Sequence, residues 1–209
     1  MCGLTRAADA QAAASLGARY IGVIFAGGPR TLDPDVAREV LDGGGENVDR
    51  VGVFGAEDAM SIAATVRRAR LDVVQLHADP RSQQVRAVRD ASGARVWAVM
   101  RVDGQLDLKL LRDLWDSADA VVLDSRVKGV LGGSGIAFDW HGAERAARER
   151  PGRLVAAGGL TAANVGEAIE TLAPDIVDVS SGVESSPGIK DHARIADFIE
   201  AVRRTGVLR

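Results

Sequence analysis

The chain has 209 residues, a length typical of one domain and sufficient to bury a large apolar core. Its 26 Lys and Arg residues face 29 Asp and Glu residues, so the formal net charge of −3 argues against a nucleic-acid partner. One cysteine excludes an internal disulfide, three separated histidines argue against a metal site, and no apolar run approaches the roughly 18 residues of a membrane span. The first residues show no signal-peptide layout. We therefore expect one domain over residues 1–209, in the cytoplasm, without metal.

Helices and short apolar strands alternate along the chain. A helix over residues 7–16 comes first, and Gly17 ends it. Seven short apolar runs of the kind found in buried parallel strands follow. We predict these strands at Tyr20–Phe25, Arg50–Phe54, Val73–Leu76, Arg95–Val99, Ala120–Leu123, Leu154–Ala156 and Ile176–Val179.

The helices between these strands have recognisable ends. Asp33 followed by Pro34 predicts an N-cap and a first helical residue for a helix that ends near Leu41. Thr161 is predicted to cap a helix over residues 164–172, and the last helix is predicted over residues 191–204. In total, eight predicted helices alternate with seven predicted strands.

This alternation predicts βαβ units and a parallel sheet, either open and doubly wound or closed as an eight-stranded barrel. Successive strands begin on average about 26 residues apart, so an eighth strand at that spacing would begin just upstream of Met1. We predict an α/β fold, a (β/α)8 TIM barrel whose first strand is truncated at the N-terminus, with a seven-stranded open sheet as the alternative. We expect the gap to leave exposed strand edges on both sides.

Functional residues of such barrels follow the carboxyl ends of the strands. Gly158-Gly159 and Ser181-Gly182 follow the last two predicted strands, where backbone N–H groups of these barrels bind phosphate. The alternative is a tight turn that needs glycine for its backbone angles. A third glycine-rich segment, residues 132–135, is interpreted as a loop that covers the substrate.

Four further residues are candidates for chemistry or recognition. Asp124 ends an apolar run at the predicted barrel mouth, where partial burial would raise its pKa toward that of a general acid; a turn-forming Asp is the alternative. Cys2 would be a base only beside positive charge or a helix N-terminus, and is otherwise an inert core residue. Arg30 could pair with a substrate carboxylate or be a solvated loop residue, and His77 could bind substrate or be structural.

Several segments, taken together and in order, are similar to one known family, the phosphoribosylanthranilate isomerases of the tryptophan pathway. The resemblance covers essentially the whole chain. It rests on Cys2-Gly3-Leu4-Thr5, Ile21–Phe25 with Pro29-Arg30, Val74-Gln75-Leu76-His77, Leu123-Asp124-Ser125 with residues 132–135, Phe138-Asp139-Trp140, Ala157-Gly158-Gly159-Leu160 with Asn164-Val165, Val177–Glu184 and Pro187–Asp191.

The resemblance implies a cofactor-free Amadori rearrangement of N-(5-phosphoribosyl)anthranilate to 1-(2-carboxyphenylamino)-1-deoxyribulose 5-phosphate. Matched by motif, Asp124 is the implied general acid that opens the sugar ring, and Cys2 is the implied general base that removes the C2′ proton. The other implied site residues all bind the substrate. They are Arg30 at the anthranilate carboxylate, Asp178 near the sugar hydroxyls, Gln75 and His77 elsewhere on the substrate, and Gly158, Gly159, Ser181 and Gly182 at the phosphate.

The sequence departs from the family pattern at three places. Only Met1 precedes Cys2 where the family has its first strand, Ala78 stands in place of a usual glycine, and Gly27-Gly28 precede Pro29 where serine is common. We therefore expect Cys2 on a frayed terminus, a natural start several residues upstream, and lower stability or activity for this chain.

Two other functions remain as alternatives. The chain could be another phosphate-binding barrel isomerase or lyase, or a non-catalytic phosphosugar-binding paralogue. In each case the expected partner is a small phosphosugar, and the protein is expected to be a monomer or a homodimer.

Overall fold

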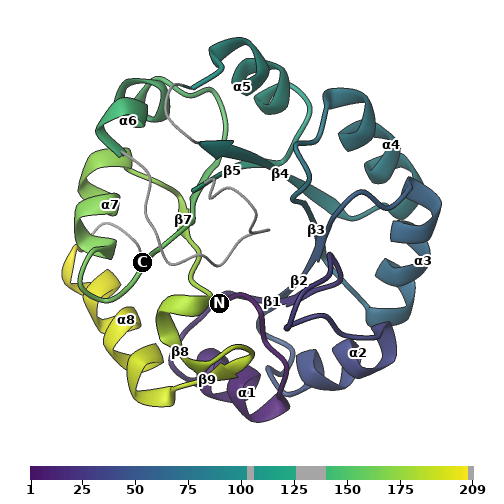
Figure 1. The fold of residues 1–209 in the computed structure, drawn as a ribbon, viewed down its shortest axis with the longest axis vertical. Helices are drawn as coiled ribbons and strands as arrows, with labels where there is room; N and C mark the ends of the chain where they lie inside the picture. The colour runs from purple at the N-terminus through teal and green to yellow at the C-terminus, as the bar shows by residue number, and fades with distance from the viewer. Residues whose placement is uncertain (103–105, 126–139, 207–209) are drawn as a thin grey trace.

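The computed structural model describes residues 1–102, 106–125 and 140–206. Within these residues seven parallel strands form one sheet in chain order, and eight α-helices form a ring outside it (Figure 1). The strands are β1 (Tyr20–Ile24), β2 (Asp49–Phe54), β3 (Val73–Leu76), β4 (Arg95–Val102), β5 (Ala120–Ser125), β6 (Leu154–Ala156) and β7 (Ile176–Val177). The helices are α1 (Ala7–Ser15), α2 (Pro34–Asp42), α3 (Ala59–Ala69), α4 (Ser82–Ser92), α5 (Leu108–Trp115), α6 (Trp140–Arg148), α7 (Val165–Leu172) and α8 (His192–Arg204).

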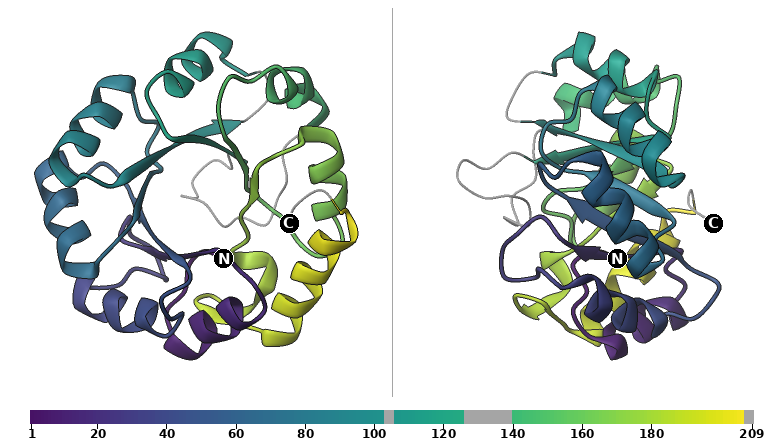
Figure 2. Two further views of the ribbon diagram at one scale, coloured as in Figure 1. Left: turned by 180° about the vertical axis from the view of Figure 1, so that it is seen from behind. Right: turned by 90° about the vertical axis from the view of Figure 1, so that its right-hand side faces the viewer.

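The predicted alternation of helices and strands is confirmed, and the view from behind shows the same ring of helices around the strands (Figure 2). After β7 the chain forms a single 3₁₀ turn, η1 (Ser181–Val183), and a small antiparallel hairpin of β8 (Glu184–Ser186) and β9 (Ile189–Lys190). The sequence analysis did not predict this hairpin, because its strands are too short to show a period-two pattern.

One predicted helix cap is confirmed and another is wrong. Asp33 caps α2 by accepting a hydrogen bond from the backbone N–H of Asp35, with Pro34 as the first helical residue. The cap of α7 is Asn164, not Thr161. A turn over Thr161 intervenes, since Thr161 donates its backbone N–H to Oδ1 of Asn164 at 2.7 Å and accepts from the Asn164 N–H at 3.3 Å.

The gap at the missing first strand is closed by the segment Met1–Leu4. Leu4 N donates to Gly22 O at 2.9 Å and Gly22 N donates to Met1 O at 2.8 Å, so the segment pairs with β1. On its other side Cys2 N donates to Val179 O at 2.9 Å. The N-terminus accordingly lies between β7 and β1 in Figure 1. The expectation of open strand edges and a frayed Cys2 is therefore wrong, because four residues suffice to bridge the gap with backbone hydrogen bonds.

The architecture is a (β/α)8 barrel in which Met1–Leu4 takes the place of the first strand. Two apolar layers hold it together, as the alternation of side chains along a strand requires. The inner layer fills the barrel with branched and aromatic side chains, among them Val51, Trp97 and Val122. Tyr20 packs edge-on against Trp97 with ring centroids 5.0 Å apart. The larger outer layer lies between strands and helices and includes Phe54, Leu76 and Leu123.

Two classes of feature are not found in the described part of the chain. No helix there is long and apolar enough to cross a membrane. The same residues contain no group of three or more His, Cys, Asp and Glu side chains arranged for a metal ion.

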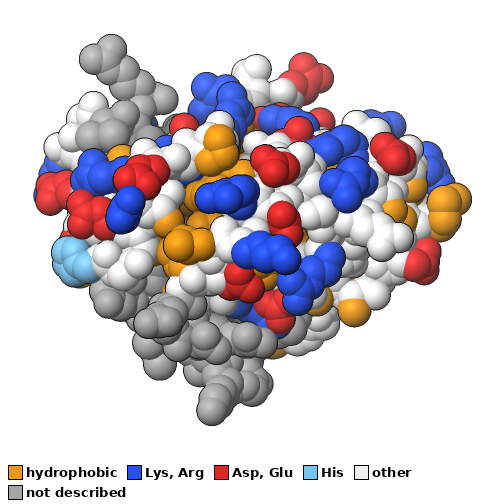
Figure 3. All heavy atoms as spheres, turned by 90° about the horizontal axis from the view of Figure 1, so that it is seen from above, with side chains coloured by type: hydrophobic (Ala, Val, Ile, Leu, Met, Phe, Trp, Pro, Cys, Tyr) orange, Lys and Arg blue, Asp and Glu red, His pale blue; other side chains and the backbone are white. Residues whose placement is uncertain are grey.

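The face around α5 carries Lys and Arg interspersed with Asp and Glu around a limited apolar area, without a basic stripe (Figure 3).

Candidate active site

A pocket opens at the carboxyl ends of the barrel strands. Its empty space, including the part open to solvent, is about 690 Å³. Every site residue predicted from the sequence lines it, so the fold brings together residues from almost the whole length of the chain. They are Cys2, Arg30, Gln75, His77, Asp124, Gly158, Gly159, Asp178, Ser181 and Gly182. The glycine-rich segment 132–135, which we interpreted as a cover, lies outside the described residues.

Asp124 is a buried carboxyl group at the end of β5, with only 7% of the residue exposed. Burial raises its pKa to about 7, and the negative charge of Asp178 acts in the same direction. A carboxylic acid with such a pKa is partly protonated at neutral pH and can donate a proton to a substrate. The predicted rise in pKa is therefore borne out by the environment that the fold creates.

His77 follows β3 and lies next to Asp124. Its Nε2 is 3.7 Å from Asp124 Oδ2, beyond hydrogen-bond distance, and neither ring nitrogen has a hydrogen-bond partner among the described residues. Burial lowers the pKa of His77 to about 4, helped by the nearby positive charge of Arg101. The imidazole is therefore neutral at pH 7, with a donor and an acceptor available to a ligand.

Cys2 is a free, buried thiol held by the hydrogen bond of its backbone to Val179. Burial raises the pKa of the thiol to about 12, and the negative charge of Asp178 adds to the rise. Two nearby cations, Lys190 and the N-terminal ammonium of Met1, oppose these effects without overcoming them. The thiol is consequently protonated in the ligand-free protein, so a role as base requires a positive charge that the substrate brings.

The two glycine segments approach each other and the acid at distances that exclude larger residues. Gly158 has a φ of +84°, and a Cβ placed there would lie 2.4 Å from Asp124 Oδ1. A Cβ on Gly182 would lie 2.0 Å from the carbonyl oxygen of Leu160, which belongs to the segment after β6. Glycine is thus needed at Gly158 for its backbone angle and for close approach, and at Gly182 for close approach alone.

These segments also offer backbone donors. The N–H groups of Gly158, Gly159, Ser181 and Gly182 have no hydrogen-bond acceptor among the described residues, yet all four residues line the pocket. The four residues are half-buried, and successive unpaired backbone N–H groups that face a pocket are suited to binding an anion such as phosphate. The turn requirement and the phosphate prediction are therefore compatible rather than competing.

Arg30 also lines the pocket and has a partner that the sequence analysis missed. Its Nε and one terminal nitrogen donate to Glu184 at 2.8 and 2.6 Å, and Glu184 also accepts from Lys190 Nζ at 2.9 Å. Glu184 and Lys190 occur in segments that carry the family resemblance but were given no role. No local pattern in the sequence marks them, because most of the residues between them are exposed: Ser185, Ser186, Pro187 and Ile189.

A barrel with a partly protonated acid, a thiol and unpaired backbone donors in one pocket points to a class of protein: an isomerase that moves protons on a phosphorylated sugar. Comparison with known proteins then specifies it. The chain belongs to the family described as N-(5'-phosphoribosyl)anthranilate isomerase, whose model matches residues 1–201.

Individual relatives agree with this membership over nearly their full length. The chain is 41% identical to N-(5'-phosphoribosyl)anthranilate isomerase from Acidithiobacillus ferrooxidans over 98% of this chain and 97% of the relative. It is similar in structure to phosphoribosyl anthranilate isomerase from Thermotoga maritima, with a TM-score of 0.88, 30% identity and coverage of 98% and 97%. A further similar structure, of phosphoribosyl anthranilate isomerase with reduced 1-(o-carboxyphenylamino)-1-deoxyribulose 5-phosphate, has a TM-score of 0.85, 30% identity and coverage of 97% and 96%.

Proposed function

We propose that this chain catalyses the aldose-to-ketose rearrangement of N-(5-phosphoribosyl)anthranilate in tryptophan biosynthesis, with Asp124 as acid and Cys2 as base. Family membership supports the reaction. The observation that carries the residue roles is the presence of both groups in one pocket, with Asp124 buried and its pKa raised to about 7. The reaction needs one acid, one base and an anion site around a bound sugar, and the pocket offers all three.

The acid step opens the sugar ring. Protonated Asp124 donates its proton to the furanose ring oxygen, the bond between that oxygen and C1′ breaks, and the lone pair of the anthranilate nitrogen forms a C=N bond. The product is an open-chain, positively charged Schiff base beside the newly formed Asp124 carboxylate. Because Asp124 is buried, that carboxylate stabilises the cation more strongly than an exposed one would.

The base step follows from the charge that ring opening creates. The cationic Schiff base adds to the positive charges of Lys190 and the Met1 ammonium, and so lowers the pKa of the thiol. The thiol proton leaves to water through the open side of the pocket, and the thiolate remains. Cys2 then removes the C2′ proton, and the electron pair of the C2′–H bond forms C1′=C2′ while the nitrogen becomes neutral. The resulting enolamine tautomerises to the ketone.

The remaining residues bind the two ends and the middle of the substrate. Arg30 holds the anthranilate carboxylate, and Asp178 accepts hydrogen bonds from sugar hydroxyls. Gln75 and His77, both buried and facing the pocket, contact the sugar. The N–H groups of the two glycine segments, Gly158-Gly159 and Ser181-Gly182, bind the phosphate.

The assembly and location of the protein are part of this proposal. A similar structure from Thermotoga maritima is of monomers of a dimeric phosphoribosylanthranilate isomerase, so both states occur for that relative. We propose a monomer or a homodimer for this chain, working in the cytoplasm on a small phosphosugar. Sedimentation would distinguish the two assembly states.

A fluorescence assay tests the function directly. The substrate, generated in situ, loses its fluorescence as it rearranges. We expect turnover by the wild-type chain without added metal or cofactor. Binding of a reduced product analogue without any turnover would instead support a non-catalytic phosphosugar-binding protein.

A further inference from the structure

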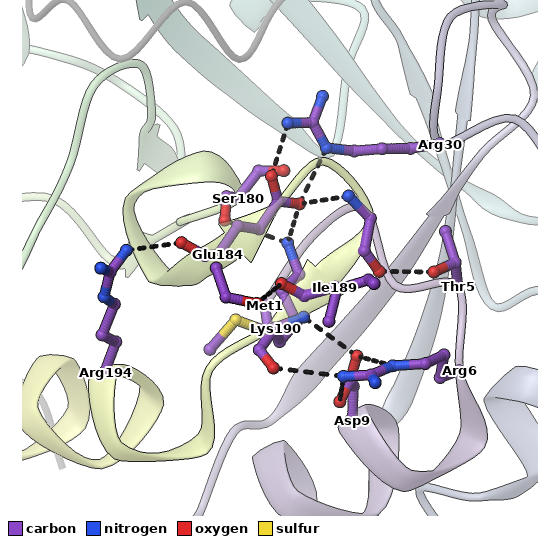
Figure 4. Close-up of polar contacts among 12 residues, drawn as sticks. Met1, Thr5, Arg6, Asp9, Arg30, Ser180, Glu184, Ile189, Lys190 and Arg194 are labelled. Atoms are coloured by element: carbon purple, nitrogen blue, oxygen red, sulfur yellow. Dashed lines mark hydrogen bonds and ion pairs between the residues drawn. The ribbon is translucent and has the colours of Figure 1, made fainter.

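A buried cluster of three charged side chains lies beside the pocket, and Glu184 is at its centre. Oε1 of Glu184 accepts from Arg30 Nε at 2.8 Å and from Lys190 Nζ at 2.9 Å, and Oε2 accepts from the Arg30 Nη2 at 2.6 Å. The side chains of Lys190 and Glu184 are 0% and 5% exposed, and that of Arg30 is 13% exposed. Figure 4 shows both cations converging on this one carboxylate.

The hairpin after β7 explains why Glu184 can contact both cations. β8 and β9 pair Glu184 directly with Lys190, which places their side chains on the same face. Lys190 Nζ also donates to the carbonyl oxygen of Ser180 at 3.0 Å, and the backbone N–H of Gly188 donates to Glu184 Oε1 at 3.3 Å. Glu184 is therefore fixed from several directions before it meets Arg30.

The groups of the cluster favour one another's charged forms. Burial lowers the pKa of Lys190, and its hydrogen bond to Glu184 acts against that lowering. Burial acts to raise the pKa of Glu184, but the hydrogen bonds from Arg30 and Lys190 outweigh it and keep the pKa below its usual range. With two cations and one anion, the cluster has a net charge of +1. Glu184 alone would neutralise Arg30, whereas the additional charge of Lys190 leaves the cluster attractive to an anion.

The geometry of Arg30 leaves one part of the guanidinium available. Its hydrogen bonds to described residues use Nε and Nη2, so the Nη1 atom is not used. Figure 4 shows this atom pointing away from Glu184, and Arg30 lines the pocket. An arginine held along one edge loses little further side-chain entropy when its other edge binds a carboxylate.

We propose that Glu184 is a positioning residue that sets substrate specificity: it holds Arg30 so that the free edge of the guanidinium binds the carboxylate of the substrate. This inference rests on the proposed function, because it assigns the carboxylate to the anthranilate end. It predicts that Glu184 acts on recognition of the carboxylate and not on the phosphate or the proton transfers.

Two stable ligands separate these effects. One is the reduced product, 1-(2-carboxyphenylamino)-1-deoxyribitol 5-phosphate, and the other is the same compound without the carboxylate. Calorimetry gives a Kd for each. The Kd of the ligand without the carboxylate, divided by the Kd of the ligand with it, measures the contribution of the carboxylate to binding. In Glu184→Gln we expect this ratio to fall by about tenfold, the value of one charge-assisted hydrogen bond, through weaker binding of the carboxylate ligand alone.

Three further variants complete the test. Glu184→Asp keeps the charge but is too short to hold Arg30 and Lys190 together, so we expect the same fall in the ratio. In an Arg30→Met background, adding Glu184→Gln should change the ratio no further, because the positioned group is gone. The matched control is Asp35→Asn, which removes the two-bond partner of Arg68 on the exposed surface and should leave the ratio unchanged.

The outcomes distinguish the two proposals. If the wild-type chain turns over but both Glu184 variants weaken the two ligands equally, or change neither, the positioning role is overturned and the function stands. If Glu184→Gln does not fold, Glu184→Asp decides the question alone. A wild-type chain that neither turns over nor binds either ligand overturns the proposed function, and this inference with it.

Discussion

Two sets of buried ionisable groups lie at or beside the same pocket, and their surroundings shift their pKa values in opposite ways. Arg30 and Glu184, with Lys190 behind them, form the ion cluster, in which each charge has a partner of opposite sign at hydrogen-bond distance. Asp124 and His77 form the unpaired group: among the described residues neither has an oppositely charged partner at hydrogen-bond distance. Their own closest approach is 3.7 Å, and Asp124 has only a backbone hydrogen bond, to Ser125. Burial is similar in both sets, so the presence of partners makes the difference.

The difference explains what each set can do. In the ion cluster, hydrogen bonds outweigh burial at Glu184, and its pKa stays low. In the unpaired group, burial dominates, so the pKa of Asp124 rises to about 7 and that of His77 falls to about 4. Paired groups remain charged and are suited to binding an anion. The unpaired His77 is neutral at pH 7, and the unpaired Asp124 titrates near physiological pH, as proton transfer requires.

The largest expected effect comes from removing the acid of the unpaired group. Asp124→Asn keeps the shape of the side chain but cannot donate an acidic proton, so kcat should fall by about 10²–10⁴ with little change in KM. The fluorescence assay measures both constants. A loss below about tenfold would remove Asp124 from the role of acid.

Cys2→Ala should produce a loss of kcat in the same range of about 10²–10⁴, because no other thiol exists in the chain to take the C2′ proton. Circular dichroism should show an unchanged fold, since the backbone of Cys2, not its side chain, makes the hydrogen bond to Val179. An alanine variant with near wild-type turnover would exclude Cys2 as the base.

The pH dependence sharpens the comparison further. The pKa of Asp124 is about 7 in the folded state and about 3.9 in the unfolded chain, so the folded state binds more protons between these values. Its contribution to stability is complete below pH 4 and is lost as the pH rises through 7. Asp124→Asn should therefore gain stability over the wild type with rising pH, up to about 4 kcal/mol at pH 8.

Urea unfolding at pH 5 and pH 8 measures this gain. The same titration should make kcat/KM of the wild type fall above about pH 7, as the acid loses its proton. A stability difference between Asp124→Asn and wild type that does not grow with pH would show that Asp124 is already ionised in the folded protein.

A substitution in the ion cluster should change the free energy of unfolding. Lys190→Met removes one cation but leaves Glu184 paired with Arg30, so we expect a loss of about 2 kcal/mol in the free energy of unfolding. The stability of this variant should still fall as the pH rises through 7, because Asp124 is unchanged. Unchanged stability in urea unfolding would mean that the desolvation of Lys190 fully offsets its hydrogen bonds.

The smallest effect is expected at the surface. Asp35 and Arg68 form a two-bond ion pair with the same donors and acceptors as Glu184 and Arg30, but both side chains are more than half exposed. Asp35→Asn should leave stability and turnover unchanged within error, because solvent screens the pair. A clear loss of stability or turnover in this variant would show that the Glu184–Arg30 pair differs from the Asp35–Arg68 pair in something other than burial.

Much of the fold followed from local patterns in the sequence. Runs such as Val73–Leu76 are apolar throughout, and only a strand with both faces covered requires that. The pairing of Asp33 with Pro34 determined where α2 begins. Because active sites of parallel barrels lie at the carboxyl ends of strands, strand positions alone were enough to select Asp124 and the glycine segments.

Other features depended on contacts between distant residues. Met1–Leu4 is too short to predict as a strand, and only β1 and Val179 beside it reveal that it closes the barrel. Thr161 has the residue type of a cap, but the geometry of the turn gave that position to Asn164. Local propensity could not decide either case, since the hydrogen-bond partners come from the folded chain.

The sequence by itself determined the parallel barrel, the end of the barrel that carries the site and most residues that line it. Only the tertiary structure decided the state of those residues. Glu184 is 154 positions from Arg30, and the charge of Asp178 acts on both Cys2 and Asp124. A pKa and an ion pair are set by burial and by neighbours a few ångströms away, and the chain acquires both only when it folds.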